Sequence, residues 1–167
     1  MERVEEALLE LATQVIERAR LARLTIGTGE SCTGGLVGYL LTEVAGSSDV
    51  FRGGIIAYAD EVKVARLGVP EATLRSHGAV SAQTAVAMAE GARHALGVEL
   101  AVAVTGIAGP AGGSADKPVG LTYLAVADVI GHDVQRFHWT GDRHANKLAS
   151  AQAALDLLLT RLQRVDA

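Results

Sequence analysis

Residues 100–104 read Leu-Ala-Val-Ala-Val, and residues 105–114 continue as Thr-Gly-Ile-Ala-Gly-Pro-Ala-Gly-Gly-Ser. An uninterrupted apolar run of this kind is typical of a strand that is covered on both faces. The glycine-rich segment behind it predicts a loop at the carboxyl end of that strand. Because ligands of open α/β sheets sit beyond the carboxyl ends of the strands, this stretch favours an α/β domain with a site in the loop.

Helical and strand patterns alternate on both sides of this stretch. Apolar residues at steps of three or four predict helices over residues 2–22, 36–44, 61–67 and 82–96, the last of these capped by Ser81, and a final helix from Arg143 to Leu162. Shorter apolar runs predict strands over residues 24–28, 54–58, 119–127 and 134–140, with a turn at residues 130–133. We therefore expect one domain over residues 1–167, a three-layer α/β/α fold with a mixed, mostly parallel sheet of about five strands and one antiparallel member.

The composition narrows the class of protein. Apolar residues make up 49% of the 167 residues, enough for a packed core and far from the composition of a disordered chain. A net charge of −4 argues against a nucleic-acid partner, because phosphate neutralisation needs a basic surface. The N-terminus lacks the pattern of a signal peptide, and no apolar stretch is long enough for a membrane helix. We expect a cytoplasmic protein without a membrane partner, and a homodimer or higher homo-oligomer.

Three polar clusters follow predicted strands, at residues 30–35, 58–63 and 105–113, and their placement predicts one composite site. In the first cluster Ser31 is a candidate nucleophile. Thr33, Gly34 and Gly35 open a helix whose unpaired amides suit a phosphate or the oxyanion of a tetrahedral intermediate. Helix capping and close helix–strand packing explain the same residues equally well.

Lys63 is the candidate base, since no Ser-His-Asp pattern is evident and a neutral lysine can activate a serine. That role requires burial or nearby positive charge to lower the lysine pKa. The competing interpretation is a solvated surface lysine. Tyr58 is expected to orient Lys63 or to relay a proton, or else to pack at the end of a strand.

Two further positions are candidate substrate ligands. Thr105, followed by Gly106, ends the buried strand and either donates a hydrogen bond to the substrate or closes the turn. Arg143 opens a helix, where the dipole disfavours a cation, and this suggests an anionic ligand; Asp142 is the alternative partner. Cys32, the only cysteine, is interpreted as a small buried apolar residue. With one cysteine the chain has no cysteine-rich metal cluster, and no metal site is expected. No cofactor is expected either, because the glycine-rich loop matches neither phosphate-loop nor dinucleotide patterns.

These motifs together resemble the CinA C-terminal-domain family. The resemblance covers roughly residues 5–163, and the motifs that carry it are those at residues 30–35, 46–48, 51–54, 57–58 with Lys63, 77–81, 105–110, 117–120 and 141–143. It implies a fold similar to the anticodon-binding-domain type and the activity of the family's enzymes. These hydrolyse the amide of nicotinamide mononucleotide, giving nicotinate mononucleotide and ammonia in pyridine-nucleotide salvage. It also implies a metal-free Ser31–Lys63 pair with Tyr58, Thr105 and Arg143 in the same site.

Two departures from the family pattern bear on activity. Where the family usually reads Tyr-Ser-Asn-Glu, this chain has Tyr58-Ala59-Asp60-Glu61, and a carboxylate there would repel a phosphate or raise the pKa of the lysine. Longer family members carry a further N-terminal domain, so we expect a stand-alone form or a fragment of a longer protein. Two alternatives remain: a catalytically silent nucleotide-binding or protein-interaction module linked to competence and DNA damage, and an amidase for another small amide.

Overall fold

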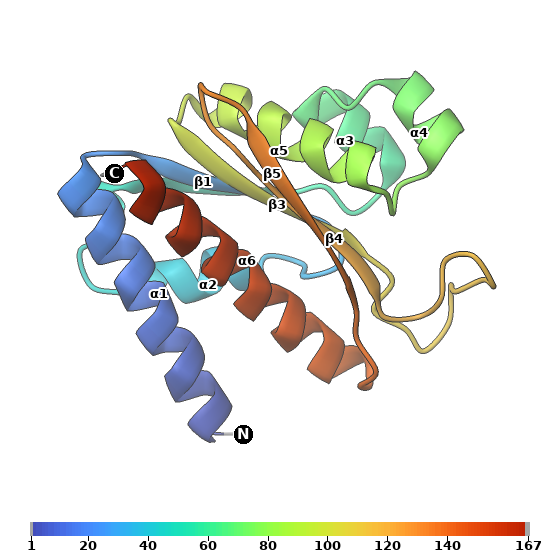
Figure 1. The fold of residues 1–167 in the computed structure, drawn as a ribbon, viewed down its shortest axis with the longest axis horizontal. Coiled ribbons are helices and arrows are strands. Elements are labelled where there is room, and N and C mark those ends of the chain that lie inside the picture. Colours follow the sequence, from blue (N-terminus) through green and yellow to red (C-terminus); the bar gives the residue numbers. More distant parts are fainter. Residues whose placement is uncertain (1, 166–167) are drawn as a thin grey trace.

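The structure is a computed structural model that describes residues 2–165. Its helices are α1 (Glu2–Ala22), α2 (Leu36–Thr42), α3 (Asp60–Leu67), α4 (Glu71–His77), α5 (Ala82–Leu96) and α6 (Arg143–Val165), with a short 3-10 helix η1 (Ser47–Asp49). Its strands are β1 (Ile26–Glu30), β2 (Phe51–Ile56), β3 (Leu100–Gly106), β4 (Leu121–Ala127) and β5 (His132–His138). Figure 1 shows the sheet between two layers of helices, with α1, α2 and α6 on one face and α3, α4 and α5 on the other.

The strands form one mixed sheet in the order β2-β1-β3-β4-β5. β1 is parallel to both β2 and β3, whereas β4 is antiparallel to both β3 and β5. Four strands therefore share one direction and only β4 opposes them, which confirms the predicted mixed sheet with one antiparallel member. The carboxyl ends of β1, β2 and β3 consequently meet at the same edge.

The central strand β3 is buried on both faces, as its apolar run predicts, but the two faces differ in side-chain size. Leu100, Val102 and Val104 contribute to the core beneath α1, α2 and α6, while Ala101 and Ala103 pack beneath α5. Small side chains let α5 lie close to the sheet. At Gly29 of β1, a Cβ atom would stand only 3.2 Å from the Cβ of Ala92 in α5.

The helix N-cap at Ser81 is confirmed, because its hydroxyl accepts a hydrogen bond from the backbone N–H of Thr84. Helix α4 was not predicted from the sequence. It buries none of its residues and so has no apolar periodicity. The turn between β4 and β5 also lies earlier than residues 130–133, because the carboxylate of Asp128 accepts the N–H groups of Ile130 and Gly131.

The first two strands are offset from their predicted positions. β1 begins and ends two residues later than expected, because Glu30 is buried as part of the strand rather than exposed in the loop. β2 begins three residues earlier, since it is an edge strand with alternating exposure and its pair of glycines disguises the strand pattern. Within residues 2–165, no helix combines the length and apolarity that crossing a membrane requires.

Candidate active site

Ser31 directly follows β1 at the edge where the parallel strands end. Its backbone N–H donates to the carbonyl of Val104 in β3 (2.9 Å), which holds the residue against the central strand. The side chain is buried, with 6% of the residue exposed, and it lines a cavity of about 230 Å³. The serine hydroxyl therefore lies at a partly open cavity at the expected end of the sheet.

Lys63 of α3 reaches the same cavity and lies beside Ser31. Its Nζ donates to Ser31 Oγ over 3.1 Å and to the backbone carbonyl of Tyr58 over 2.9 Å. Only 1% of the residue is exposed, which excludes the alternative of a solvated surface lysine. The fold thus brings together two residues that are 32 positions apart in the sequence.

Burial lowers the pKa of the Lys63 ammonium, because removing the charge from water disfavours the protonated form. Asp60 opposes this effect, since its carboxylate lies 3.7 Å from Nζ and favours the charged amine. Asp60 is itself about half exposed, with 57% of its side chain accessible, so solvent weakens the pairing. The desolvation is the larger influence, and its direction is the one that a general base needs.

Tyr58 and Arg143 form a bridge at the mouth of the cavity. One guanidinium nitrogen of Arg143 donates to the carbonyl of Gly109 (2.7 Å) and another to the hydroxyl of Tyr58 (3.3 Å). Asp142 does not pair with Arg143; its carboxylate instead accepts the N–H of Ala145 and caps the start of α6. Tyr58 contacts Lys63 through its backbone carbonyl, while the residue as a whole stays 62% exposed.

Thr105 and Gly106 line the opposite wall of the cavity. The hydroxyl of Thr105 donates to the carbonyl of Ala79 (2.7 Å), so this group joins the end of β3 to the segment between α4 and α5. That segment contributes Ala79 and Val80 to the lining, and the glycine-rich loop contributes residues 107–109 and 111–112. The sequence did not reveal the part of residues 79–80, because they carry no reactive side chain.

Thr33, Gly34 and Gly35 do not line the Ser31 cavity; they line a second, larger one between α1, α2 and α6. The expectation that the first amides of the following helix stay unpaired is wrong. The N–H groups of Val37 and Gly38 both donate to the carboxylate of Glu30, at 2.9 and 3.0 Å. The negative charge at the start of α2 is therefore supplied by the Glu30 carboxylate.

Glu30 is thus a structural residue that the sequence interpretation missed. It is 2% exposed and also accepts hydrogen bonds from the hydroxyls of Thr33 (2.7 Å) and Thr28 (3.3 Å). A glutamate three residues before the threonine–glycine pair that precedes the helix is the signal that could have identified it, because a carboxylate there satisfies the helix amides.

Cys32 is buried at the border of the Ser31 cavity, and burial raises the pKa of its thiol to about 11. The thiol is therefore protonated near neutrality and is a poor nucleophile, in agreement with its interpretation as a small apolar residue. Across residues 2–165, no group of three or more His, Cys, Asp or Glu side chains is arranged to hold a metal ion.

The fold and the site define a class: a three-layer α/β domain with a buried serine–lysine pair where its parallel strands end. The sequence matches the CinA C-terminal domain family over residues 8–162, and the chain belongs to that family. A CinA-like protein from Geobacter sulfurreducens is 54% identical over 147 residues, covering 86% of this chain and 36% of that protein. The chain thus spans about a third of the length of that relative.

Solved structures of the family share the fold. The competence/damage inducible protein CihA from Agrobacterium tumefaciens is 44% identical, with a TM-score of 0.87 over 93% of this chain and 95% of that one. A CinA superfamily protein from Klebsiella pneumoniae is 30% identical, with a TM-score of 0.90 over 94% of this chain and 98% of that one. These similarities extend through all the elements that carry the serine–lysine pair.

Proposed function

We propose that this protein is an amidohydrolase in which Ser31 attacks a carboxamide and Lys63 transfers the protons. The contact of 3.1 Å between Lys63 Nζ and Ser31 Oγ, inside a cavity, is the observation that carries the proposal. Burial lowers the pKa of Lys63, so a larger fraction of the amine is neutral than in free lysine. A neutral amine can accept the serine proton.

In the first half of the reaction, the Ser31 hydroxyl donates its proton to Nζ as Oγ bonds to the carboxamide carbon. The carbonyl oxygen becomes an oxyanion in the tetrahedral intermediate. The Lys63 ammonium then protonates the amide nitrogen, the C–N bond breaks, and ammonia leaves. An ester to Ser31 and a neutral lysine remain.

In the second half, a water molecule takes the place of ammonia. Lys63 accepts a proton from that water as its oxygen bonds to the ester carbon. Collapse of the second tetrahedral intermediate breaks the bond to Oγ, and the ammonium returns a proton to Ser31. The product is a carboxylic acid, and the pair is restored without a metal.

The substrate that we propose is nicotinamide mononucleotide, hydrolysed to nicotinate mononucleotide and ammonia. The support is the family resemblance at the motifs of Ser31, Lys63 and Arg143, now joined by the proximity of these three residues at one cavity. An acidic chain needs local cations for a phosphate-bearing substrate, and Arg143 stands at the cavity mouth.

Ammonia release from nicotinamide mononucleotide by the purified chain tests the proposal. We expect Ser31→Ala to lower the rate by at least about 10³-fold while the circular dichroism spectrum is unchanged. Cys32→Ser is the matched control, because it alters the adjacent residue and should keep most of the rate. Near-normal turnover by Ser31→Ala would eliminate the covalent mechanism.

A second candidate function is a silent nucleotide-binding or protein-interaction module. The carboxylate of Asp60 favours it, because it acts to keep Lys63 charged. A relative from Halothermothrix orenii, 45% identical over 84% of this chain, is named a putative competence-damage inducible protein. Binding of the nucleotide by the wild-type chain without ammonia release would select this alternative.

A further inference from the structure

The Ser31 cavity is too small for a whole mononucleotide. Its volume of about 230 Å³ lies below the roughly 300–1,000 Å³ of ordinary small-molecule pockets. A nucleotide whose carboxamide lies at Ser31 must therefore extend out of this cavity. Arg143 already donates hydrogen bonds to the Gly109 carbonyl and the Tyr58 hydroxyl. Another cation near the exit of the cavity could therefore bind the phosphate.

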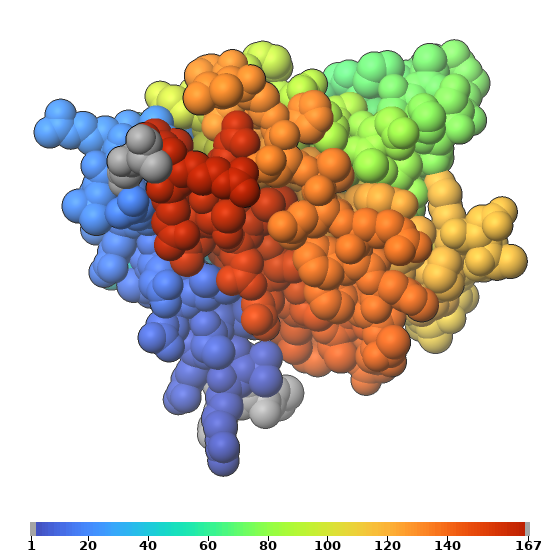
Figure 2. Space-filling view, viewed as in Figure 1, coloured from blue at the N-terminus to red at the C-terminus, as the bar shows by residue number. Residues whose placement is uncertain are grey.

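A second cavity, of about 480 Å³, lies where the N-terminal ends of α1 and α6 diverge in front of α2 (Figure 1). In the space-filling view the blue start of α1 projects beyond the orange start of α6 (Figure 2). The walls are largely apolar, and the charged or titratable side chains among them are those of Glu5, Tyr39, His144 and Lys147. We name this space the α1–α6 cavity.

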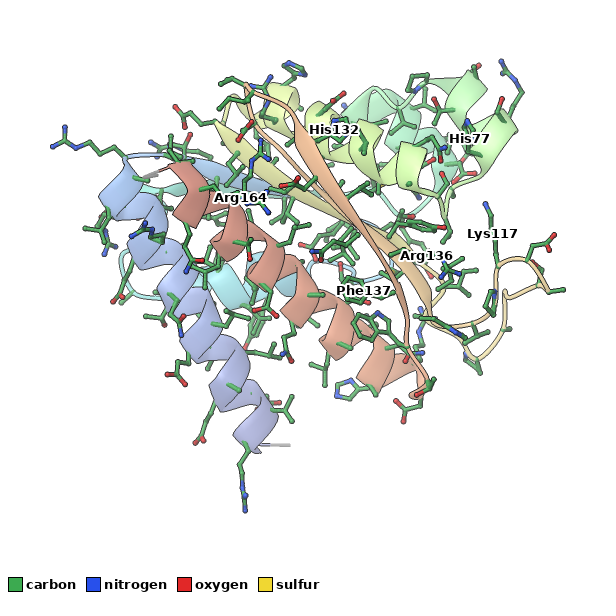
Figure 3. All side chains as sticks on the ribbon, in the orientation of Figure 1. His77, Lys117, His132, Arg136, Phe137 and Arg164 are labelled. Carbon is green, nitrogen blue, oxygen red and sulfur yellow. The ribbon has the colours of Figure 1, made fainter. Side chains whose placement is uncertain are left out.

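Lys147 is distinguished by its lack of a partner. Of the three lysines in the sequence, Lys63 bonds to Ser31, and Lys117 donates to the carbonyl of His77 (2.5 Å), toward which it points in Figure 3. Lys147 makes no hydrogen bond or ion pair with any residue between 2 and 165. Lys147 is half-buried as a residue, and an anion bound in the cavity would provide the counter-charge that the protein does not.

The Lys147 ammonium points at the backbone between the two cavities. A Cβ atom built on Gly34 would stand 3.6 Å from Nζ, so the missing side chain leaves the ammonium accessible. The neighbouring Cys32 thiol is flanked by Lys147 and Lys63, whose charges both lower its pKa against the larger raising effect of burial. The two lysines thus approach one short segment from opposite cavities.

Helix α6 borders both cavities. Arg143 lines the Ser31 cavity and Lys147 lines the α1–α6 cavity, four residues further along the helix. Residues at this spacing lie on one face of a helix, about 5–6 Å apart. In a pyridine mononucleotide the ribose separates the pyridine ring from the phosphate by a similar distance.

We propose that the α1–α6 cavity is the subsite for the phosphate-bearing end of the substrate, with Lys147 as the main anion ligand and His144 beside it. The inference rests on the proposed amidase function, whose substrate carries both an amide and a phosphate. The apolar walls reduce solvent screening and so strengthen a charge-assisted hydrogen bond. Glu5, the one carboxylate of the lining, is exposed on α1, where solvent attenuates its repulsion.

Kinetics with paired substrates test the subsite. We expect Lys147→Gln to raise the KM for nicotinamide mononucleotide by about tenfold or more, and to leave the KM for nicotinamide riboside, which has no phosphate, unchanged. Lys147→Arg should recover most of the affinity, because it retains the charge. Arg136→Gln removes an exposed cation of β5 that lines neither cavity and is the matched control. Equal losses on both substrates would overturn the proposal.

Calorimetric binding separates the failure of this inference from a failure of the proposed function. Ribose 5-phosphate and nicotinamide mononucleotide are titrated into Ser31→Ala protein, which needs no turnover. Weaker binding of both after the added Lys147→Gln change supports the subsite even if no ammonia is released. A different outcome is weaker binding of ribose 5-phosphate while the protein prefers nicotinamide mononucleotide over nicotinamide riboside as strongly as before. That outcome would indicate a separate effector site and would overturn the subsite proposal.

Discussion

Two charged side chains are buried at the edge of the sheet where the parallel strands end, and their surroundings differ sharply. Glu30 ends β1, and Lys63 of α3 follows β2. Both are almost completely withdrawn from solvent, at 2% and 1% exposure. Burial is therefore the same for both, and what distinguishes them is the set of groups around each charge.

Glu30 is surrounded by donors. Two helix amides and two threonine hydroxyls point at its carboxylate, at the positive end of the α2 dipole. Lys63 has an uncharged hydroxyl, one carbonyl and a carboxylate that remains 3.7 Å away. A buried charge with enough hydrogen-bond partners around it is stabilised, whereas a buried charge with too few partners is easily neutralised by the gain or loss of a proton.

The two side chains are therefore suited to different roles: Glu30 stabilises the local structure, and Lys63 is suited to proton transfer. A carboxylate with four donors stabilises the turn that follows β1, and this turn fixes Ser31. An ammonium whose pKa is lowered by burial can give and take protons. Substitutions at the two positions should consequently fail in different assays, which makes the comparison testable.

The largest expected effect is the loss of activity in Lys63→Met. Methionine has nearly the length of lysine but cannot accept a proton, so we expect ammonia release to fall by about 10²–10⁴-fold. Lys63→Arg should fail similarly, because arginine stays charged. Both variants should fold, as judged by circular dichroism. Retention of most of the rate by Lys63→Arg would mean that Lys63 acts only as a positive charge.

Glu30→Gln should show the opposite pattern, a loss of stability. The amide group replaces one acceptor oxygen by a donor that faces other donors, and we expect a cost of about 2–3 kcal/mol in the free energy of unfolding. Urea denaturation measures this cost. Glu43→Gln, at the exposed C-terminal end of the same helix, is the control and should stay within about 0.5 kcal/mol. An unchanged free energy of unfolding in Glu30→Gln would contradict the structural role of Glu30.

A smaller effect is expected from Asp60→Asn. Removing the carboxylate that favours protonated Lys63 should lower the pKa of this lysine further, so the rising limb of the pH–rate profile should move to lower pH. Glu61→Gln neutralises the next residue, also exposed, and should leave the profile unchanged. A shift toward higher pH in Asp60→Asn would show that Asp60 acts on another group.

The smallest effect concerns stability and pH. Below the lowered pKa of Lys63 the folded protein bears a buried charge. Between that pKa and the ordinary lysine value, the unfolded chain binds more protons, so stability rises with pH. Lys63→Met should lack this rise and should be more stable near pH 7, by about 1 kcal/mol. Thermal unfolding of both proteins between pH 7 and 10 measures the difference; parallel curves would contradict it.

The sequence alone predicted much of the fold, for reasons that are local. The apolar run of β3 predicted a buried central strand, and the Ser81 cap and the periodicity behind it predicted α5. It failed where tertiary contacts replace a local pattern. Glu30 became part of β1 because its donors come from another element, and α4 forms without any apolar face.

The candidate site divides in the same way. Polar residues at strand ends predicted that Ser31, Lys63 and Thr105 are neighbours, since parallel strands end at one edge. The place of Arg143 in the same site was implied by the family resemblance. The direction of each side chain did not follow from the pattern. Thr33, Gly34 and Gly35 line the α1–α6 cavity, and the Thr33 hydroxyl donates to Glu30. Tyr58 contacts Lys63 through its backbone carbonyl.

The sequence by itself thus determined the layers, the mixed sheet and the edge that carries the site, because periodicity and turn residues are local properties of the chain. Only the tertiary structure decided which of two buried charges is compensated. It also decided that Lys63 meets Ser31 in one cavity while Lys147 faces another without a partner. Compensation depends on groups brought from distant parts of the chain, and no local pattern encodes their distances.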